Sequence, residues 1–195
     1  MKNFMIIASA SRSTLGIGNN GKIPWKITQD MKLFKDITST SCLNKKNVVI
    51  MGRKTWESLP NKSRPLPDRI NIVISRDPLI RTKIGIPATV LVVDSLNLAL
   101  MLSSNDTIDK VYVIGGGSVY QEAIELLSCS RIYLTEVLTE ITGIDTFFPI
   151  IPHRFKMVAL SDTYIENKVE YRFIEYANEF EHTKLSIDLL STDVK

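Results

Sequence analysis

Apolar, β-branched runs alternate with helical patterns along most of this chain, and that alternation constrains its fold more than any other feature. Runs such as NVVIM at 47–51 and INIVIS at 70–75 are almost continuously apolar, as is typical of strands buried on both faces. Strands separated by helices predict βαβ units and a mostly parallel sheet with helices on both faces. The expected strands are 3–10, 47–51, 70–75, 89–93, 110–115, 131–137, 155–161 and 170–177. The expected helices are 28–38, 53–58, 95–103 and 118–127.

The predicted fold is therefore α/β: a single domain with a central, mostly parallel eight-stranded sheet, an antiparallel C-terminal strand and about four helices. The last run, 170–177, alternates apolar and polar residues, which favours a solvated edge strand paired antiparallel with 155–161. We assign residues 1–177 to this domain. The pattern changes after Ala177, so residues 178–195 are predicted to be either a C-terminal extension or the start of an interdomain linker.

Composition argues against several classes of function. The 195 residues carry a net charge of only +3 with both signs interspersed, which does not fit a nucleic-acid arm or a polybasic membrane patch. Two cysteines, Cys42 and Cys129, and two histidines cannot form a His/Cys metal cluster, and they favour a reduced cytoplasmic protein over a disulfide scaffold. The N-terminal MKNFMIIASASRS weakly imitates a secretory signal, but its apolar run is short and fits a first core strand.

Three glycines follow a predicted strand in VYVIGGGSVYQEAI and precede a predicted helix. Gly115 and Gly117 match the first two glycines of the dinucleotide-binding fingerprint GxGxxG, but Tyr120 stands where the third would be. A helix that starts after such a turn can bind phosphate with its unpaired N–H groups. A tight turn without any ligand explains this motif equally well.

A second strand-to-helix turn, VVIMGRKTWESL, carries cations. Arg53 and Lys54 open the predicted helix, where positive charge opposes the helix dipole unless an anion binds there. Arg76 follows the end of a third strand. Two glycine turns and three cations at the carboxyl ends of strands indicate a phosphate-rich dinucleotide.

Asp30, in IPWKITQDMKLF at 23–34, is an acid on the apolar face of the predicted helix 28–38. It lies three, four and seven residues from Ile27, Phe34 and Ile37, and so shares their face. An acid in the first helical turn is stabilised by the helix dipole and can reach water. A buried acid would instead have a raised pKa, suited to holding or relaying a proton near neutrality. The helical pattern leaves both interpretations open.

The chain resembles dihydrofolate reductase from Met5 to about Tyr176. The matching segments, in chain order, are GIGNNGKIPW, DMKLF, VIMGRKTWESLP, RPLPDRINIVISR, IGGGSVYQEA, YLTEV and DTFFP. Each segment is a weak signal alone, but the set is highly specific. The resemblance implies NADPH-dependent reduction of 7,8-dihydrofolate to 5,6,7,8-tetrahydrofolate, with hydride transfer from nicotinamide C4 to pterin C6 and protonation at N5.

The resemblance also implies roles for individual residues. Asp30 matches the acid that hydrogen-bonds the pterin and promotes protonation at N5, Thr135 matches the threonine bonded to that acid, and Trp25 matches the residue that holds a water beside it. Arg69 matches the arginine that binds the α-carboxylate of the glutamate tail. Without the resemblance, each would pass for an ordinary core or surface residue. The other implied substrate contacts are Ile6, Ile7, Ala8, Met31, Phe34, Leu59, Leu66, Ile114 and Tyr120.

NADPH is the implied cofactor, and no metal is expected. The Gly115–Gly116 bond resembles a cis peptide of the family, and residues 16–23 resemble a mobile loop that closes over the nicotinamide. Asp94 departs from the pattern, because the family often has Arg or Lys there, near the 2′-phosphate; this weakens the case for NADPH at that edge. The implied cofactor contacts are Ala8, Ile17, Gly18, Gly52, Arg53, Lys54, Thr55, Ser75, Arg76, Ile114, Gly115, Gly116, Gly117, Ser118, Val119 and Tyr120.

Several alternatives stay open. A pyrimidine or pteridine reductase of similar fold would lack the combined Asp30, Thr135 and Arg69 set, a non-catalytic nucleotide-binding module would need no buried acid, and a nucleic-acid binder would need a basic stripe with exposed aromatics. The implied partners are dihydrofolate and antifolate inhibitors, with no nucleic acid and no membrane, and the protein is expected to be a cytoplasmic monomer. In some eukaryotes this reductase is fused to thymidylate synthase, so this chain is alternatively the reductase part of such a bifunctional protein.

Overall fold

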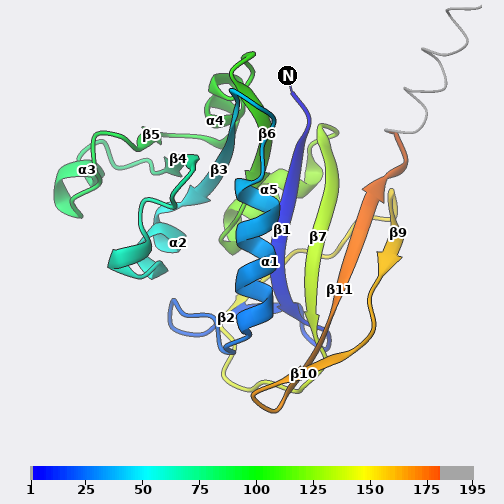
Figure 1. The fold of residues 1–195 in the computed structure, drawn as a ribbon. Coiled ribbons are helices and arrows are strands. Elements are labelled where there is room, and N and C mark those ends of the chain that lie inside the picture. The colour runs from blue at the N-terminus through cyan, green and yellow to red at the C-terminus, as the bar shows by residue number, and fades with distance from the viewer. Residues whose placement is uncertain (1, 181–195) are drawn as a thin grey trace, which may run out of the picture.

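A large β-sheet forms the centre of the computed structural model, which describes residues 2–180 (Figure 1). The strands are β1 (Phe4–Ser11), β2 (Gly16–Gly18), β3 (Lys46–Gly52), β4 (Arg69–Ile74), β5 (Leu91–Val93), β6 (Ile108–Val113), β7 (Cys129–Val137), β8 (Thr146–Phe147), β9 (Phe155–Leu160), β10 (Tyr164–Glu166) and β11 (Val169–Asn178). The helices are α1 (Thr28–Ser39), α2 (Arg53–Ser58), α3 (Ile80–Lys83), α4 (Leu96–Leu102) and α5 (Gly117–Glu125), with a 3-10 turn, η1 (Asn61–Ser63). The predicted extension at 178–195 lies, after Phe180, outside the described residues.

The main sheet has nine strands in the order β10-β11-β7-β1-β6-β3-β4-β5, with β9 also paired to β11. Strands β1, β3, β4, β5, β6 and β7 are parallel to their neighbours in this group, and β11 is antiparallel to β7, β9 and β10. The predicted α/β fold with a mostly parallel sheet is confirmed, and all eight expected strands and four expected helices form. The additional elements β2, β8, β10 and α3 have two to four residues each, too few for a readable periodic pattern.

β11 does not occupy the edge position that its alternating pattern predicts. It lies between β7 on one side and β9 and β10 on the other. Alternation shows that one face of a strand meets solvent, and it carries no information about which strand is last in the sheet. The edge is formed instead by β10 and by β9, whose residues after Phe155 are all exposed.

Two cores lie on opposite faces of the sheet, as the alternation of side chains along β1 requires. Ile6 belongs to the core covered by α4 and α5, whereas Ile7 belongs to the core that α1 and α2 cover. Figure 1 shows α1 in front of the sheet and α5 behind it. Helices therefore cover both faces, as predicted. Among residues 2–180, no helix combines the length and apolar character needed to cross a membrane.

The tip of the β10–β11 hairpin is a tight turn of two residues. Glu166 pairs with Val169, and the two residues between them, Asn167 and Lys168, have left-handed backbones with φ of 51° and 64°. These angles are typical of a type I′ turn, which matches the twist of the flanking strands and favours Asn-Gly. The side-chain amide of Asn167 also donates to the carbonyl of Lys26 at 3.0 Å, so the tip supports the segment that leads into α1.

Replacing Lys168 with glycine should raise the free energy of unfolding by roughly 0.5–1 kcal/mol, because glycine adopts the left-handed conformation without the steric strain that lysine incurs. Urea unfolding measures the change. The matched control is Lys35→Gly at an exposed position within α1, which should lower stability by about 1 kcal/mol. A loss of stability in Lys168→Gly would contradict the assigned turn.

Candidate active site

Glu166, at the end of β10, caps the N-terminus of α1. Its carboxylate accepts hydrogen bonds from the backbone N–H groups of Thr28 at 2.8 Å and Gln29 at 3.3 Å. The Thr28 side chain and these backbone groups hold the pKa of Glu166 below its usual value. A negative charge is most stable at this end of a helix. Glu166 therefore provides the stabilising charge and the hydrogen-bond acceptor that an acid in the first turn would otherwise provide. Asp30 instead turns towards the sheet.

Asp30 is a half-buried carboxyl bonded to β7. Thr135 Oγ1 donates to Asp30 Oδ1 at 2.6 Å, and Thr135 itself is only 4% exposed. Burial raises the pKa of Asp30, and hydrogen bonds from Thr135 and Ser9 offset part of that rise. Of the two interpretations left open by the helical pattern, the geometry favours the buried acid. Such a carboxyl holds its proton to higher pH than a solvated one.

Trp25 and Ser9 extend this polar group. The indole N–H of Trp25 donates to Ser9 Oγ at 2.9 Å. Ser9 in β1 is the register partner of Thr135 in β7, so the two hydroxyl side chains stand next to each other on one face of the sheet. Trp25, Ser9, Asp30 and Thr135 thus form one connected set of hydrogen-bonding groups.

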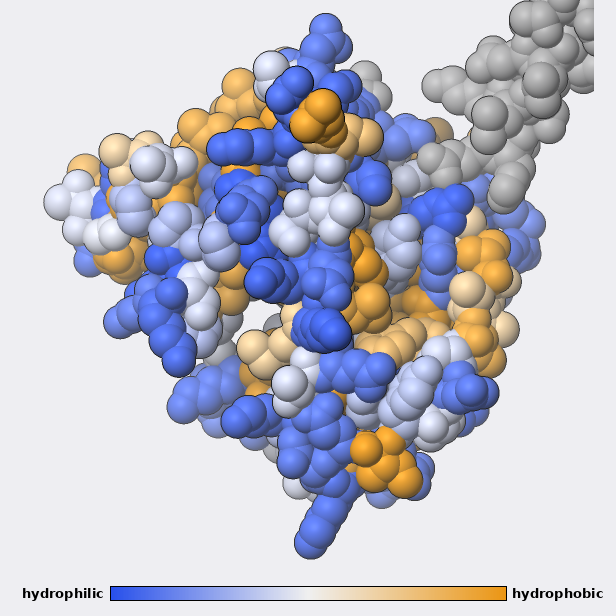
Figure 2. Space-filling view, viewed as in Figure 1, coloured by the Kyte–Doolittle hydropathy of each residue, from blue (hydrophilic) through white to orange (hydrophobic). Residues whose placement is uncertain are grey.

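A largely apolar cavity of about 370 Å³ opens beside Asp30, between α1 and strands β1, β7, β9 and β11. Figure 2 shows apolar side chains gathered along this side of α1. The volume lies within the range of small-molecule sites. Four predicted site residues, Ile7, Asp30, Phe34 and Thr135, line it together. The other lining residues are Leu33, Ile37, Tyr133, Leu134, Ala159, Leu160, Ser161, Phe173, Ile174 and Glu175.

Several other predicted substrate contacts pack in the core on the α1 and α2 side of the sheet. Leu66 and Ile114 are buried there, 7% and 8% exposed, and Leu59 packs against them. Met31 differs, because 63% of it is exposed on α1. An apolar side chain left this open is free to contact a bound ligand.

Two of the predicted substrate contacts face the other way. Ile6 is fully buried in the core under α4 and α5, and Ala8 shares that core. Because neighbouring strand residues point to opposite faces, Ile6 and Ile7 cannot both reach the cavity, and the structure brings only Ile7 there. Tyr120, in the same core as Ile6, donates its hydroxyl proton to the Ile7 carbonyl at 2.8 Å, and burial raises its pKa.

Arg69, the first residue of β4, has an oriented guanidinium. Nε donates to the Pro67 carbonyl at 2.8 Å, Nη1 donates to Thr38 Oγ1 at 2.6 Å, and the group lies 5.8 Å from the centre of the Phe34 ring. Thr38 is fully buried and donates its own hydroxyl proton to the Phe34 carbonyl. Burial lowers the pKa of Arg69, although a guanidinium stays charged in proteins. A guanidinium group whose plane is fixed in this way suits a bidentate contact with a carboxylate.

The two glycine turns identified in the sequence are adjacent in space. β3 and β6 are parallel neighbours, and the N–H of Gly52 after β3 donates to the carbonyl of Gly115 after β6 at 2.7 Å. A side-chain carbon at Gly52 would lie 3.1 Å from Val119, and one at Gly116 would lie 3.2 Å from the Thr55 hydroxyl. Larger residues would therefore crowd this contact. The Gly115–Gly116 peptide is cis, which confirms that prediction.

Both turns lead into helices whose first N–H groups receive no side-chain cap. In α5 the first turn includes Ser118, which is exposed, and Val119, which is buried. In α2 it includes Lys54, which is exposed, and Arg53, which pairs with Glu57 one turn later. The adjacent turns thus combine uncapped N–H groups with positive charge, which fits the phosphates of a dinucleotide.

The next two strands bring opposite charges to the same edge. Ser75 and Arg76 follow β4, and Asp94 follows the neighbouring parallel strand β5. The N–H of Ser75 donates to the carbonyl of Val93 at 2.8 Å, so the two strand ends are in direct contact. Arg76 and Asp94 are both exposed. The acid that departs from the family pattern therefore lies close to the cation expected to bind phosphate.

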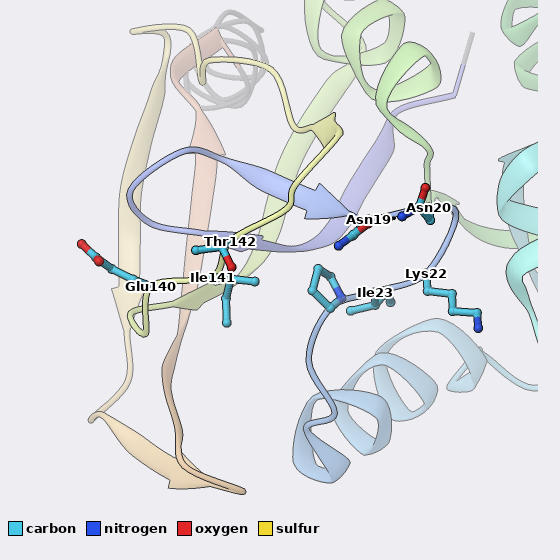
Figure 3. Close-up of a pocket in the computed structure, with 8 residues that line it drawn as sticks. Asn19, Asn20, Lys22, Ile23, Glu140, Ile141 and Thr142 are labelled. Atoms are coloured by element: carbon cyan, nitrogen blue, oxygen red, sulfur yellow. Dashed lines mark hydrogen bonds between the residues drawn. The ribbon is translucent and has the colours of Figure 1, made fainter.

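Residues 16–23, the predicted mobile loop, form a small hairpin. Asn19 and Lys22 bridge across a turn, and Asn20 donates its backbone N–H to Asp145 at 2.7 Å. That bond and one from Thr146 hold the pKa of Asp145 below its usual value. An open cavity of about 570 Å³ separates the hairpin from residues 140–142, two segments that face each other in Figure 3. The predicted contacts Ile17 and Gly18 lie in β2, which leads into this turn and pairs antiparallel with β8.

Two residues with direct roles in this geometry were not predicted. Ser9 bonds Trp25 and Asp30, and Thr38 bonds Arg69. Thr38 lies four residues after Phe34, so the helical pattern could have placed it on the same face. Nothing in the sequence pairs Ser9 with Thr135, because the register of two strands so far apart is set by the folded sheet. Within residues 2–180, no three His, Cys, Asp or Glu side chains gather closely enough to hold a metal ion.

Replacing Asp30 with asparagine should make the protein progressively more stable than the wild type as the pH rises. The folded pKa of Asp30 lies above the ordinary value of 3.8, so wild-type stability is full below that value and falls until the pH passes the folded pKa. Asparagine does not ionise and escapes this loss. Urea unfolding from about pH 4 to about pH 8 measures the difference, with Asp106→Asn at an exposed position as the control. A difference that stays constant over this range would contradict the raised pKa.

Comparison with known proteins identifies the family. The family model described as dihydrofolate reductase matches residues 3–178. The dihydrofolate reductase of Schistosoma mansoni is 42% identical over 171 residues, which cover 83% of this chain and 89% of that protein. The dihydrofolate reductase of Aedes albopictus is 37% identical over 181 residues, which cover 90% of this chain and 95% of that protein. The bifunctional dihydrofolate reductase-thymidylate synthase of Daucus carota is 39% identical over 181 residues, 90% of this chain but 34% of that protein.

This chain therefore spans about a third of the length of the bifunctional plant relatives and most of the length of the single-function ones. The match to the family model covers nearly all of the described domain. On these grounds the chain belongs to the dihydrofolate reductase family.

Proposed function

We propose that this chain reduces 7,8-dihydrofolate to 5,6,7,8-tetrahydrofolate with NADPH. The observation that carries the proposal is the half-buried Asp30 carboxyl, bonded to Thr135 at 2.6 Å beside a largely apolar cavity. A flat heterocycle with a hydrogen-bonding edge fits such a site, because its faces meet apolar side chains while its edge meets the acid. The oriented Arg69 supports a substrate that ends in a carboxylate.

Asp30 has two tasks in this proposal: it binds the 2-amino and N3 edge of the pterin, and it promotes delivery of a proton to N5 through a water. Burial raises its pKa, which brings the acid closer to the pH at which the enzyme works. Thr135 donates to one carboxyl oxygen and so fixes the plane in which the acid meets the ring. Thr135 thereby orients the Asp30 carboxyl before the substrate binds, so the substrate meets an acid that is already in position.

Arg69 binds the α-carboxylate of the glutamate tail in this proposal. Its guanidinium is already oriented by Pro67 and Thr38, so less side-chain freedom is lost when the tail binds. Phe34, Leu59 and Leu66 belong to the core on this face of the sheet and would provide apolar surface for the aminobenzoyl ring.

Membership of the family implies a nicotinamide cofactor, and we assign NADPH. When bound, the nicotinamide would supply the hydride for C6 of the pterin. The turn at Gly115–Gly117 and the N-terminus of α5 would hold the pyrophosphate, because their N–H groups are uncapped. Arg53, Lys54 and Arg76 would bind the 2′-phosphate that distinguishes NADPH from NADH. The hairpin at 16–23 would close over the nicotinamide and exclude water.

A pyrimidine reductase of similar fold is the nearest alternative. Such an enzyme is expected to lack the combination of Asp30, Thr135 and Arg69. In this chain Asp30 and Thr135 are hydrogen-bonded, and the Arg69 guanidinium is oriented through a fully buried threonine. These features favour dihydrofolate over a pyrimidine substrate.

Other expectations stay predictions. They are antifolate binding at the same site, a cytoplasmic monomer, and continuation of the native chain into thymidylate synthase. Relatives with and without the synthase match this chain at similar identity, so identity does not distinguish the two arrangements. Determining the size of the native protein from its source tests the fusion.

Replacing Asp30 with asparagine should lower kcat for dihydrofolate reduction by a factor of about 10²–10⁴, the usual contribution of a positioned acid. The amide keeps the shape of the carboxyl but cannot supply the proton. NADPH oxidation after addition of dihydrofolate measures the effect. Asp36→Asn, at an exposed position on the same helix, is the matched control and should keep full activity. Full activity of Asp30→Asn would exclude the role assigned to the acid, and a wild-type protein without turnover would exclude the reaction.

Replacing Arg76 with alanine should raise KM for NADPH by roughly tenfold and leave KM for NADH within about twofold, because one charge-assisted contact to phosphate is lost. Asp94→Asn should change KM for NADPH in the opposite direction, since it removes a negative charge near the same phosphate. Steady-state kinetics with each cofactor measure both changes. Equal effects of Arg76→Ala on the two cofactors would contradict the assigned phosphate contact.

A further inference from the structure

Ser9 lies where the acid and the tryptophan of the site meet. It is half-buried in β1 and forms a register pair with Thr135 in β7. Because paired residues of neighbouring strands point to the same face, two hydroxyl groups lie side by side beneath α1. Thr135 bonds Asp30 directly at 2.6 Å, and the register pairing with Thr135 places the Ser9 hydroxyl beside the same carboxyl, where it lowers the pKa of Asp30.

The direction of the hydrogen bonds in this group follows from the chemistry of its members. An indole N–H can only donate, so Ser9 Oγ must accept the 2.9 Å bond from Trp25. The hydroxyl proton of Ser9 is then available for donation, and an ionised carboxylate only accepts. The bonds therefore run in one direction, from Trp25 through Ser9 to Asp30.

We propose that Ser9 is a positioning residue for Asp30: it is held by the Trp25 indole N–H and donates its own proton to the Asp30 carboxylate, although it is not among the residues that line the cavity. With Thr135 donating as well, the carboxylate is oriented by two hydroxyls on adjacent strands. The role of Ser9 in turnover rests on the proposed reduction of dihydrofolate, whereas its bond to Asp30 can be tested without turnover.

A donor to the ionised form favours ionisation, so Ser9 opposes the effect of burial on Asp30. The other titratable groups around Asp30 are the same in every Ser9 variant described below, so they cannot cause a difference in the Asp30 pKa among these variants. They are Tyr120 and Tyr171, which interact with Asp30 electrostatically, and Tyr133 and Glu175 across the cavity, of which Glu175 pairs with Arg131.

Replacing Ser9 with alanine should raise the pKa of Asp30 by about one unit, the value expected when a carboxylate loses one hydroxyl donor. Carbon NMR of the carboxyl groups during a pH titration measures this pKa, and the Asp30 signal is assigned by its loss in Asp30→Asn. The matched control is Ser11→Ala. Ser11 lies on the same strand and face, but its hydroxyl bonds Ser13 and Thr14.

Two further variants separate the hydroxyl from the shape of the side chain. Ser9→Cys keeps nearly the same shape with a weak donor and should raise the pKa of Asp30 as alanine does. Ser9→Thr keeps the hydroxyl and should leave that pKa close to the wild-type value. The cysteine variant answers the question if the alanine variant does not fold. An Asp30 pKa unchanged in Ser9→Ala or Ser9→Cys would overturn the proposal.

The pH profile of turnover tests the functional part. The midpoint of the profile of kcat should move to higher pH by the same amount in Ser9→Ala, and Ser9→Ala should have no further effect in an Asp30→Asn background. A purely structural role would lower kcat at every pH without moving the midpoint. If the wild type fails to reduce dihydrofolate, the proposed function fails while the NMR titration still decides whether Ser9 bonds Asp30.

Discussion

β1 pairs in parallel with β7 on one side and with β6 on the other, and the geometry of the whole site depends on this central position. The β7 side sets Ser9 beside Thr135, so two hydroxyls meet the acid carried by α1. The β6 side leads to the glycine turn at the start of α5, where Tyr120 reaches back to the Ile7 carbonyl. One strand therefore connects the proton chemistry to the dinucleotide end of the site, and a shift of its register by one residue would turn Ser9 and Ile7 away from the acid.

Two carboxylates, Glu166 and Asp30, have separate roles at the start of α1. Glu166 lies at the N-terminus of α1, where its charge is stabilised, and the β10–β11 hairpin to which it belongs is bonded through Asn167 to the segment before α1. Asp30 is thereby free to face a largely apolar cavity, where burial raises its pKa and the hydroxyls of Thr135 and Ser9 limit that rise. The pKa values of the two acids shift in opposite directions because burial dominates at Asp30 and hydrogen bonds to the helix N-terminus dominate at Glu166.

Much of the fold could be predicted from the sequence because its long elements carry strong periodic patterns. The eight expected strands and the four expected helices all lie close to their predicted bounds; they are β1, β3, β4, β5, β6, β7, β9 and β11, with α1, α2, α4 and α5. The prediction that β11 lies at the edge of the sheet was wrong, because alternation indicates which face of a strand meets solvent and not which strand is last in the sheet. The short elements β2, β8 and β10 were missed. Of these, β2 and β8 pair as a two-stranded sheet that includes residues of the predicted mobile loop, and β10 carries the Glu166 cap.

The sequence by itself determined the fold class, the apolar face of α1 to which Asp30 belongs, and the glycine turns with their cations. Each of these features depends on residues that are close together in the chain. Only the tertiary structure decided that Asp30 is bonded to Thr135, 105 residues away, that Ser9 joins Trp25 to the same acid, and that Ile6 faces away from the cavity. These outcomes depend on strand register and on which face of the sheet a helix covers. Both are settled by packing between distant segments, for which local periodicity carries no signal.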